Sequence, residues 1–224
     1  PFTRYQQEKF LKLWLVVSNL NNLLPYLSRP ISLIIIFSIV YVFSLPPFGV
    51  SIFYYISFSI IFYNLLTNEN FSKKYIFYFF LFTQIITLSW ITQSFYSGGF
   101  GYLFLGIILV GVLSLFIAFL HYSATILILV TFKKKLLQIF LLPLGLSIVE
   151  ILKEFIFGGF PWNPSAIIYY KNIWILNSLP LLGVYGLGLV VHLIVGLIIY
   201  FLYCKNKVVT FCLSSVLVFI YAFG

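Results

Sequence analysis

The sequence predicts an all-α integral membrane protein with about seven transmembrane helices and a cytoplasmic N-terminus. Of its 224 residues, 62% are hydrophobic and only 8% are charged, whereas a soluble domain carries about a quarter charged residues. The apolar residues form long continuous runs, unlike the short alternating strands of a membrane β-barrel. The basic residues gather in short clusters between these runs, as they do in the cytoplasmic loops of membrane proteins.

Seven apolar segments are candidate spans, because a helix needs roughly 20 apolar residues to cross the hydrocarbon core. The first is short and ends at Pro46-Pro47, since proline cannot continue a helix. The fourth apolar run continues to Phe132, which favours a long, tilted helix. The predicted spans cover about residues 31–45, 50–67, 75–93, 102–125, 136–157, 181–203 and 208–224, and together they make residues 31–224 one multi-spanning membrane domain.

The distribution of lysine and arginine predicts the orientation of these spans. If the seven spans alternate, eleven of the 13 basic residues fall on one side, and the positive-inside rule makes that side cytoplasmic. These residues are Arg4, Lys9, Lys12, Arg29, Lys73, Lys74, Lys133, Lys134, Lys135, Lys205 and Lys207. The two exceptions are Lys153 and Lys171, which lie on either side of an aromatic motif described below.

Residues 1–30 form a basic segment that we expect on the cytoplasmic side. Residues 5–24 fit either an amphipathic helix on the membrane surface, with Lys9 and Lys12 facing anionic headgroups, or a poorly ordered basic terminus. The net charge of +9 is not the footprint of a nucleic-acid-binding protein, because the basic residues sit in short clusters between apolar runs. We expect no cofactor.

Three charged residues share one face of the predicted fifth helix. Glu150, Lys153 and Glu154 are spaced i, i+3 and i+4, so Lys153 is able to pair with either glutamate. Charges at membrane depth are costly and often functional. The alternative is a structural ion pair near the outer end of the helix, with side chains that snorkel to the interface.

The stretch Phe160-Pro161-Trp162 follows this helix and lies between paired glycines and an Asn-Pro. Proline fixes its own φ and restricts the preceding residue, so the turn is rigid. It is either a fixed aromatic wall for a lipid or an anchor in the aromatic belt. The long outer loop at 158–180 is still apolar, so we expect it to lie in the interface or dip back into the protein, with Tyr169, Tyr170 and Trp174 at headgroup level.

The histidines and cysteines give no clear site. Nothing in the sequence places His121 and His192 together, and each is interpreted as an interhelical hydrogen-bonding residue rather than a metal ligand. Cys204 and Cys212 are interpreted as small buried hydrophobic residues, because no activating base is visible. The sequence predicts no metal site.

The motifs together resemble the membrane domain of bacterial apolipoprotein N-acyltransferase. The resemblance rests on Glu150 and Lys153, followed by Gly159-Phe160-Pro161-Trp162 and then by Gly183-Val184-Tyr185-Gly186-Leu187. Weaker likenesses are Leu45-Pro46-Pro47-Phe48, and Ser89-Trp90 leading into Gly98-Gly99. The likeness runs from about residue 35 to 224. The family often has arginine where this chain has Lys153, and glutamine where it has Asn177.

This resemblance implies a function in lipoprotein maturation at the bacterial inner membrane. The family transfers a fatty acyl chain from a phospholipid to the amino group of a lipoprotein's N-terminal diacylglyceryl cysteine, at the periplasmic face. It implies that Trp162, with Phe160, Pro161 and Trp90, faces lipid, and that Glu150, Lys153, Glu154 and Tyr185 support the site.

The family's catalysis belongs to a nitrilase-like domain that follows these helices. We therefore assign no catalytic residue here, and expect the chain to be the membrane half of the enzyme, inactive alone, as a truncated product, a split-gene half or a fragment. Two alternatives stay open: a transporter or channel component without enzymatic activity, and a scaffold for a separately encoded nitrilase-like partner. The expected partners are a phospholipid acyl donor and a diacylated lipoprotein acceptor, and no nucleic acid.

Overall fold

The computed structural model describes residues 30–96, 98–159, 163–204 and 215. These residues form helices and no strand, which confirms the predicted all-α class. Three predicted features lie outside them: the basic segment before Pro30, the Phe160-Pro161-Trp162 turn, and the last span except for Ser215. The elements are α2 (Pro30–Val42), α3 (Ile52–Thr67), α4 (Lys74–Leu88), the 3₁₀ helix η1 (Ser89–Ile91), α5 (Thr92–Tyr96), α6 (Phe100–Thr131), α7 (Lys135–Ile156), the 3₁₀ helix η2 (Ser165–Tyr169), α8 (Ile173–Leu176) and α9 (Leu179–Cys204).

Four helical segments among the described residues are long and apolar enough to cross a membrane: Lys74–Tyr96, Phe100–Thr131, Lys135–Ile156 and Leu179–Cys204. The apolar helices α2 and α3 are shorter, with 13 and 16 residues. At 1.5 Å per residue they extend about 20 and 24 Å, less than the roughly 30 Å of the hydrocarbon core. The described residues therefore support a multi-spanning membrane protein, but they do not confirm the predicted count of seven.

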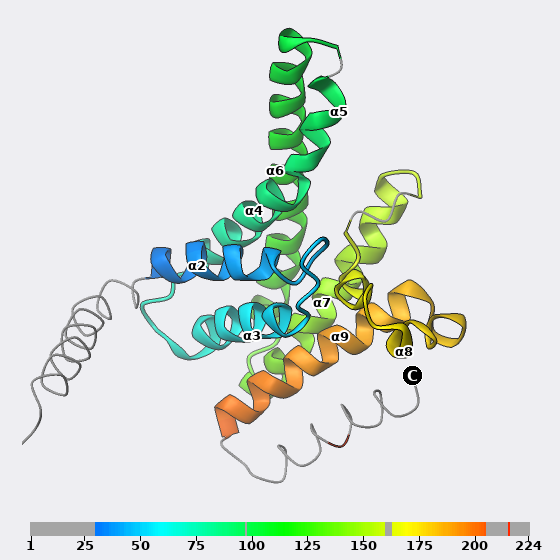
Figure 1. Ribbon diagram of the computed structural model, residues 1–224. Coiled ribbons are helices and arrows are strands. Elements are labelled where there is room, and N and C mark those ends of the chain that lie inside the picture. Colours follow the sequence, from blue (N-terminus) through cyan, green and yellow to red (C-terminus); the bar gives the residue numbers. More distant parts are fainter. Residues whose placement is uncertain (1–29, 97, 160–162, 205–214, 216–224) are drawn as a thin grey trace, which may run out of the picture.

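The helices pack around an aromatic core formed mainly by α3 and α4. Phe58 stacks on Tyr54 at 4.6 Å between ring centroids and meets Phe79 edge-on at 5.4 Å. Helix α2 packs against α3 and α4, and α4 also packs against α6 (Figure 1). The 32-residue α6 is the longest helix, as its apolar run predicts, and its beginning extends with α5 beyond the other helices (Figure 1).

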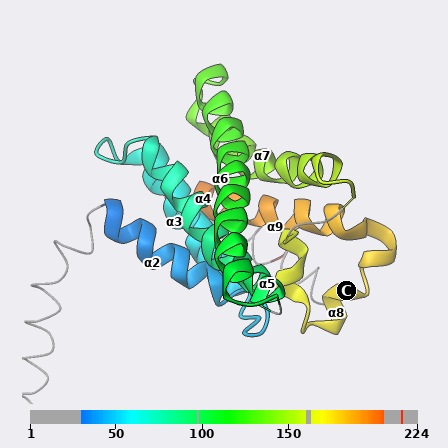
Figure 2. The same ribbon diagram turned by 90° about the horizontal axis from the view of Figure 1, so that it is seen from above.

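Helices α7 and α9 form a second packed pair, which contacts the first group through α3 and α6 (Figure 2). Pro143 lies inside α7 and cannot donate the hydrogen bond that the carbonyl of Ile139 would accept. That carbonyl faces Gly196 of α9, where an added Cβ would lie only 3.4 Å from it. The glycine therefore lets α9 approach α7 at the point where proline interrupts the hydrogen bonding of α7.

Candidate functional site

The face of α7 that carries the predicted charges is buried. Ser147, Glu150 and Lys153 follow one another at intervals of three residues, which places them on one side of the helix. Glu150 is 8% exposed and Lys153 is 3% exposed, and their charges interact. Lys153 therefore does not snorkel to the surface, and the charged face forms part of a polar cluster inside the helix bundle.

His192 joins three helices within this cluster. Its Nε2 atom lies 2.7 Å from the Tyr54 hydroxyl of α3, and its Nδ1 atom lies 2.7 Å from the Ser147 hydroxyl of α7. Both are hydrogen-bond distances, and a neutral imidazole donates through one nitrogen and accepts through the other. Nε2 also lies 3.8 Å from Glu150 Oε1. The prediction that His192 forms hydrogen bonds between helices is confirmed.

Glu150 connects the cluster to the loop that follows the aromatic motif. Its Oε1 atom accepts a hydrogen bond of 2.8 Å from the backbone N–H of Ser165, and its Oε2 atom accepts one of 3.2 Å from the Ser165 hydroxyl. Ser165 begins η2, three residues after Trp162. A buried carboxylate that accepts two hydrogen bonds from one residue holds that residue in place. Glu150 therefore anchors the chain just beyond the Phe-Pro-Trp turn.

Gly188 of α9 makes this anchor possible. A Cβ at position 188 would lie 2.8 Å from the Ser165 hydroxyl oxygen and 3.0 Å from Glu150 Oε2. Contacts under about 3 Å are too short for a methyl group, so any larger residue would displace the loop or the carboxylate.

A polar cavity of about 20 Å³ lies at the centre of the cluster. Its lining includes both histidines together with Glu150, Lys153 and Asn163. A space of this size holds about one water molecule and is far too small for an acyl chain. The cluster is thus suited to positioning the loop rather than to performing chemistry on a lipid.

The two histidines meet at this cavity, which nothing in the sequence indicated. His121 differs from the prediction, because its Nδ1 atom bonds the carbonyl of Ile117 in its own helix rather than another helix. Its ring packs on Phe80 of α4, with 4.8 Å between ring centroids. Among the described residues, no three His, Cys, Asp or Glu side chains are grouped closely enough to bind a metal.

The loop from Asn163 to Ser178 folds back onto the protein. The hydroxyls of Tyr169 and Tyr55 form a hydrogen bond, and the burial of Tyr169 raises its pKa, so this hydroxyl remains protonated. Two further hydrogen bonds of 2.7 Å run from Tyr170 Oη to the carbonyl of Pro47 and from Lys171 Nζ to the carbonyl of Phe48. The loop is therefore held against the Pro-Pro-Phe-Gly turn between α2 and α3.

The residues on both sides of the Phe-Pro-Trp turn have backbone conformations that favour a sharp change of direction. Gly158 and Gly159 have positive φ values of 67° and 94°, and Asn163 has a φ of 42°. Side chains other than glycine and asparagine are strained in this region. Phe160, Pro161 and Trp162 themselves lie outside the described residues, so their role as a lipid-facing wall stays a prediction.

The remaining predicted residues lie around this cluster rather than in it. Glu154 is half-buried, and its charge acts on Tyr185, whose buried hydroxyl has no hydrogen-bond partner in the part of the chain that the structure describes. Trp90 is 58% exposed in η1, and no hydrogen bond or ring contact between described residues joins it to Glu150. Cys204 is exposed, which corrects the prediction that it is buried, and Cys212 lies outside the described residues.

Three residues of the cluster were missed by the sequence analysis: Tyr54, Ser147 and Ser165. Tyrosine and serine are common in this sequence, so neither type stood out. One signal was available for Ser147, which lies one turn before Glu150 and therefore on the same helix face. Tyr54 and Ser165 reach the cluster only through the packing of α3 and the folding of the loop.

Comparison with protein families identifies the family of the chain. The family model described as apolipoprotein N-acyltransferase N-terminal domain matches residues 37–197, more than half of the chain. The match includes the Glu150 cluster, the Phe-Pro-Trp turn and the loop that Glu150 anchors. A search of curated proteins gave no match. The chain therefore belongs to the family of the apolipoprotein N-acyltransferase N-terminal domain.

Proposed function

We propose that this chain forms the membrane part of an N-acyltransferase that transfers a fatty acyl chain from a phospholipid to the N-terminal diacylglyceryl cysteine of lipoproteins. The observation that carries the proposal is the family match over residues 37–197. In this proposal the chain positions lipid substrates, and the acyl-transfer chemistry belongs to a nitrilase-like domain. That domain is either joined to the membrane part or supplied by a separate chain.

The role of the Glu150 cluster is to hold the lipid-facing motif in place. Glu150 binds Ser165 just beyond the Phe-Pro-Trp turn, and α7 ends at Ile156 just before it. The described residues on both sides of the motif are thus held in place, and in this proposal the aromatic residues between them contact an acyl chain. In this proposal Trp162 lines the path of the acyl chain, and Trp90 contributes to a lipid-facing surface nearby.

The proposed location is the bacterial inner membrane, with seven spans, the N-terminus in the cytoplasm and the loop at 158–180 facing the periplasm. Its support is the grouping of Lys73, Lys74 and Lys133 to Lys135 in the turns at one end of the bundle. The two basic exceptions are both engaged: Lys153 is buried near Glu150, and Lys171 donates to the carbonyl of Phe48. Their positions therefore reflect local structure rather than the orientation signal.

An acyl-transfer assay tests the function directly. The purified chain in liposomes receives phosphatidylethanolamine and a diacylated lipopeptide, with or without a nitrilase-like domain from the same family, and mass spectrometry detects the triacylated product. We expect product only when the nitrilase-like domain is present. Product from the chain alone would show that its own residues perform the chemistry, and absence of product in both arms would contradict the proposal.

A matched pair of tryptophan variants tests the role of the aromatic turn. We expect Trp162→Ala to slow acyl transfer in the complete system by about tenfold or more, as expected when a group that positions the substrate is lost, while the protein stays folded. Trp174 lies in the same loop, is 60% exposed in α8 and serves as the control. Equal rates for Trp162→Ala and Trp174→Ala would remove Trp162 from the lipid path.

A further inference from the structure

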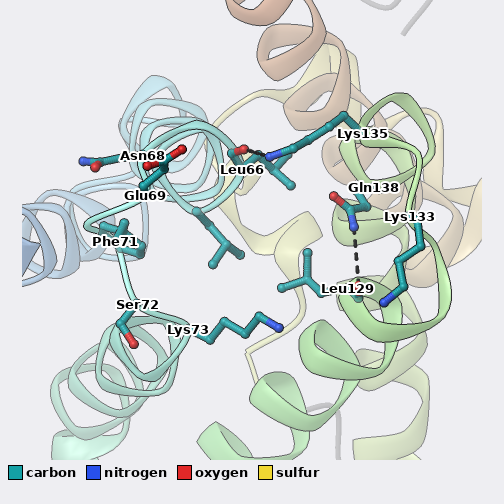
Figure 3. A pocket seen from close by; sticks show the side chains of 11 residues that line it. Leu66, Asn68, Glu69, Phe71, Ser72, Lys73, Leu129, Lys133, Lys135 and Gln138 are labelled. Carbon is teal, nitrogen blue, oxygen red and sulfur yellow. Dashed lines mark hydrogen bonds between the residues drawn. The ribbon is translucent and has the colours of Figure 1, made fainter.

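A second, larger pocket lies at the opposite end of the helices from the anchored loop. Its volume is about 560 Å³, and it opens between the α3–α4 turn and the α6–α7 turn (Figure 3). The lining combines polar and charged groups of both turns with apolar side chains from the ends of α3 and α6. Neither the family match nor the proposed acyl transfer assigns a role to this pocket.

The pocket carries an excess of positive charge. Lys73, Lys133 and Lys135 line it, against the single carboxylate of Glu69. Figure 3 shows Lys73 reaching from the α3–α4 turn toward the α6–α7 side, while Lys135 and Gln138 come from the start of α7. Lysines contributed by two separate turns thus converge on one space, which favours an anionic ligand.

Two of the three lysines are available to a ligand. Lys135 donates to the carbonyl of Leu66, but Lys73 and Lys133 have no hydrogen-bond or ion-pair partner among the described residues. Gln138 is held in place, since its amide nitrogen lies 2.5 Å from the carbonyl oxygen of Phe132. The pocket therefore has a fixed wall and two ammonium groups that no described residue neutralises.

Two helix N-termini add to the positive potential. Helix α4 begins at Lys74 and α7 begins at Lys135, and neither has an acidic residue in its first turn or a side-chain cap. The start of a helix carries a partial positive charge from its unpaired N–H groups. These two helix starts lie at the lysines that line the pocket, so they reinforce the attraction for an anion.

The apolar part of the lining identifies the kind of anion. Leu65, Leu66, Phe71 and Leu129 line the pocket beside the lysines. On the neighbouring turns of α6 and α7, Leu127, Val130 and Leu136 are each at least half exposed. A soluble anion would leave this apolar surface uncovered, whereas the glycerol and acyl chains of a phospholipid would cover it.

We propose that this pocket binds the phosphate group of an anionic phospholipid, with the headgroup between Lys73 and Lys133 and the acyl chains along α6 and α7. The group that the lysines would recognise is a phosphate. Free inorganic phosphate carries the same group and is the alternative ligand. The site is separate from the acyl-donor path of the proposed function and does not depend on it. Bound lipid would join the α3–α4 and α6–α7 turns.

Adjacent lysines in the chain provide a matched control for the test. Lys74 lies over the Tyr75 ring at 5.5 Å, and Lys134 is exposed, and neither lines the pocket. The double variants Lys73→Gln/Lys133→Gln and Lys74→Gln/Lys134→Gln therefore remove the same charge from the same two turns. Native mass spectrometry of the full chain in detergent compares retention of phosphatidylglycerol with that of phosphatidylcholine carrying the same acyl chains.

We expect the wild-type chain and the Lys74/Lys134 control to retain phosphatidylglycerol over phosphatidylcholine. Phosphatidylglycerol should bind the Lys73/Lys133 variant about tenfold more weakly or worse, since each lysine near the headgroup contributes to the attraction. Lys73→Arg/Lys133→Arg should restore retention and so exclude a folding defect. Excess inorganic phosphate should leave the lipid bound.

Two outcomes would overturn the proposal. Equal loss of phosphatidylglycerol from both glutamine variants would mean that the lipid responds to overall charge and not to the pocket. Displacement of phosphatidylglycerol by inorganic phosphate, with phosphate retained by the wild type and lost from the Lys73/Lys133 variant, would identify a free-phosphate site instead.

Discussion

Two residues in the interior of this protein, Glu150 and His192, connect segments that lie far apart in the sequence. Glu150 accepts both hydrogen bonds that Ser165 provides, and His192 bridges α3 and α7. In a low-dielectric interior an unpaired polar group is costly, so satisfied polar contacts fix one arrangement of the chain. The cluster thereby ties the loop that begins with Asn163 to three helices.

The bridge made by His192 is testable with a double-mutant cycle. Replacing His192 with leucine leaves the buried hydroxyls of Tyr54 and Ser147 without this partner, at a cost of about 1–3 kcal/mol for each unsatisfied group. Tyr54→Phe removes one of these hydroxyls, so the double variant should be less destabilised than the sum of the two single changes. Thermal unfolding in detergent measures all four proteins, and strict additivity would show that the Tyr54–His192 contact contributes nothing.

The anchor made by Glu150 predicts a large effect confined to one loop. Glu150→Ala leaves the Ser165 N–H without its acceptor and removes the negative charge that interacts with the buried Lys153, and breaking a buried charge interaction costs about 3–5 kcal/mol. We expect a lower melting temperature and faster hydrogen–deuterium exchange over residues 163–176. Glu154→Ala, one turn further along α7 and half-buried, is the control. Comparable exchange in the two variants would contradict the anchoring role.

At the scale of elements, the pairing of α7 with α9 depends on small residues at defined positions. Gly196 faces the carbonyl that Pro143 leaves without its usual partner, and Gly188 faces the contact between Ser165 and Glu150. Small residues allow close approach of helices in membranes, where the hydrophobic effect does not drive helices together. The α9 helix is itself bent at Gly183, which has a φ of 65° and begins the Gly-Val-Tyr-Gly-Leu motif.

Two glycine variants separate this packing from helix propensity. Gly188→Ala introduces a methyl group 2.8 Å from the Ser165 oxygen, and we expect a loss of about 1–3 kcal/mol together with release of the loop. Gly111→Ala in α6 meets nothing within 4 Å, so it should be neutral or slightly stabilising. Unfolding temperatures of the two variants give the comparison. A stable Gly188→Ala protein with a protected loop would show that α9 does not constrain the loop.

At the scale of the whole molecule, turns that connect the described helices meet in pairs at two ends of the bundle. The α3–α4 and α6–α7 turns meet around the basic pocket, and the α2–α3 turn meets the loop that contains η2 and α8. Loops far apart in sequence therefore pack in pairs at each end of the bundle. The predicted orientation places the basic pair in the cytoplasm and the other pair outside.

Labelling of single cysteines tests this orientation. In a chain with Cys204 and Cys212 replaced by serine, a cysteine at Lys73 or Lys133 should react with a membrane-impermeant reagent only from the cytoplasmic side, since both side chains are exposed. A cysteine at the exposed position Trp174 should react only from the outside. Reaction of all three positions from the same side would contradict the alternation of the helices.

The sequence by itself determined the membrane class, the approximate position of six helices and the family. These follow from hydropathy, from prolines and glycines at the helix ends, and from one motif, all of which are local in the chain. It also placed Glu150 and Lys153 on one helix face, because helical periodicity fixes that relation without tertiary structure.

Only the tertiary structure decided what these residues contact. The partners of Glu150 and His192 lie 15 to 138 positions away in the sequence, in segments whose tyrosines and serines look ordinary. The lengths of α2 and α3, the meeting of the two histidines and the basic pocket also depend on packing between helices. Hydropathy specifies which residues enter the membrane, but interhelical contacts depend on shape and hydrogen bonding between distant segments, which no local pattern encodes.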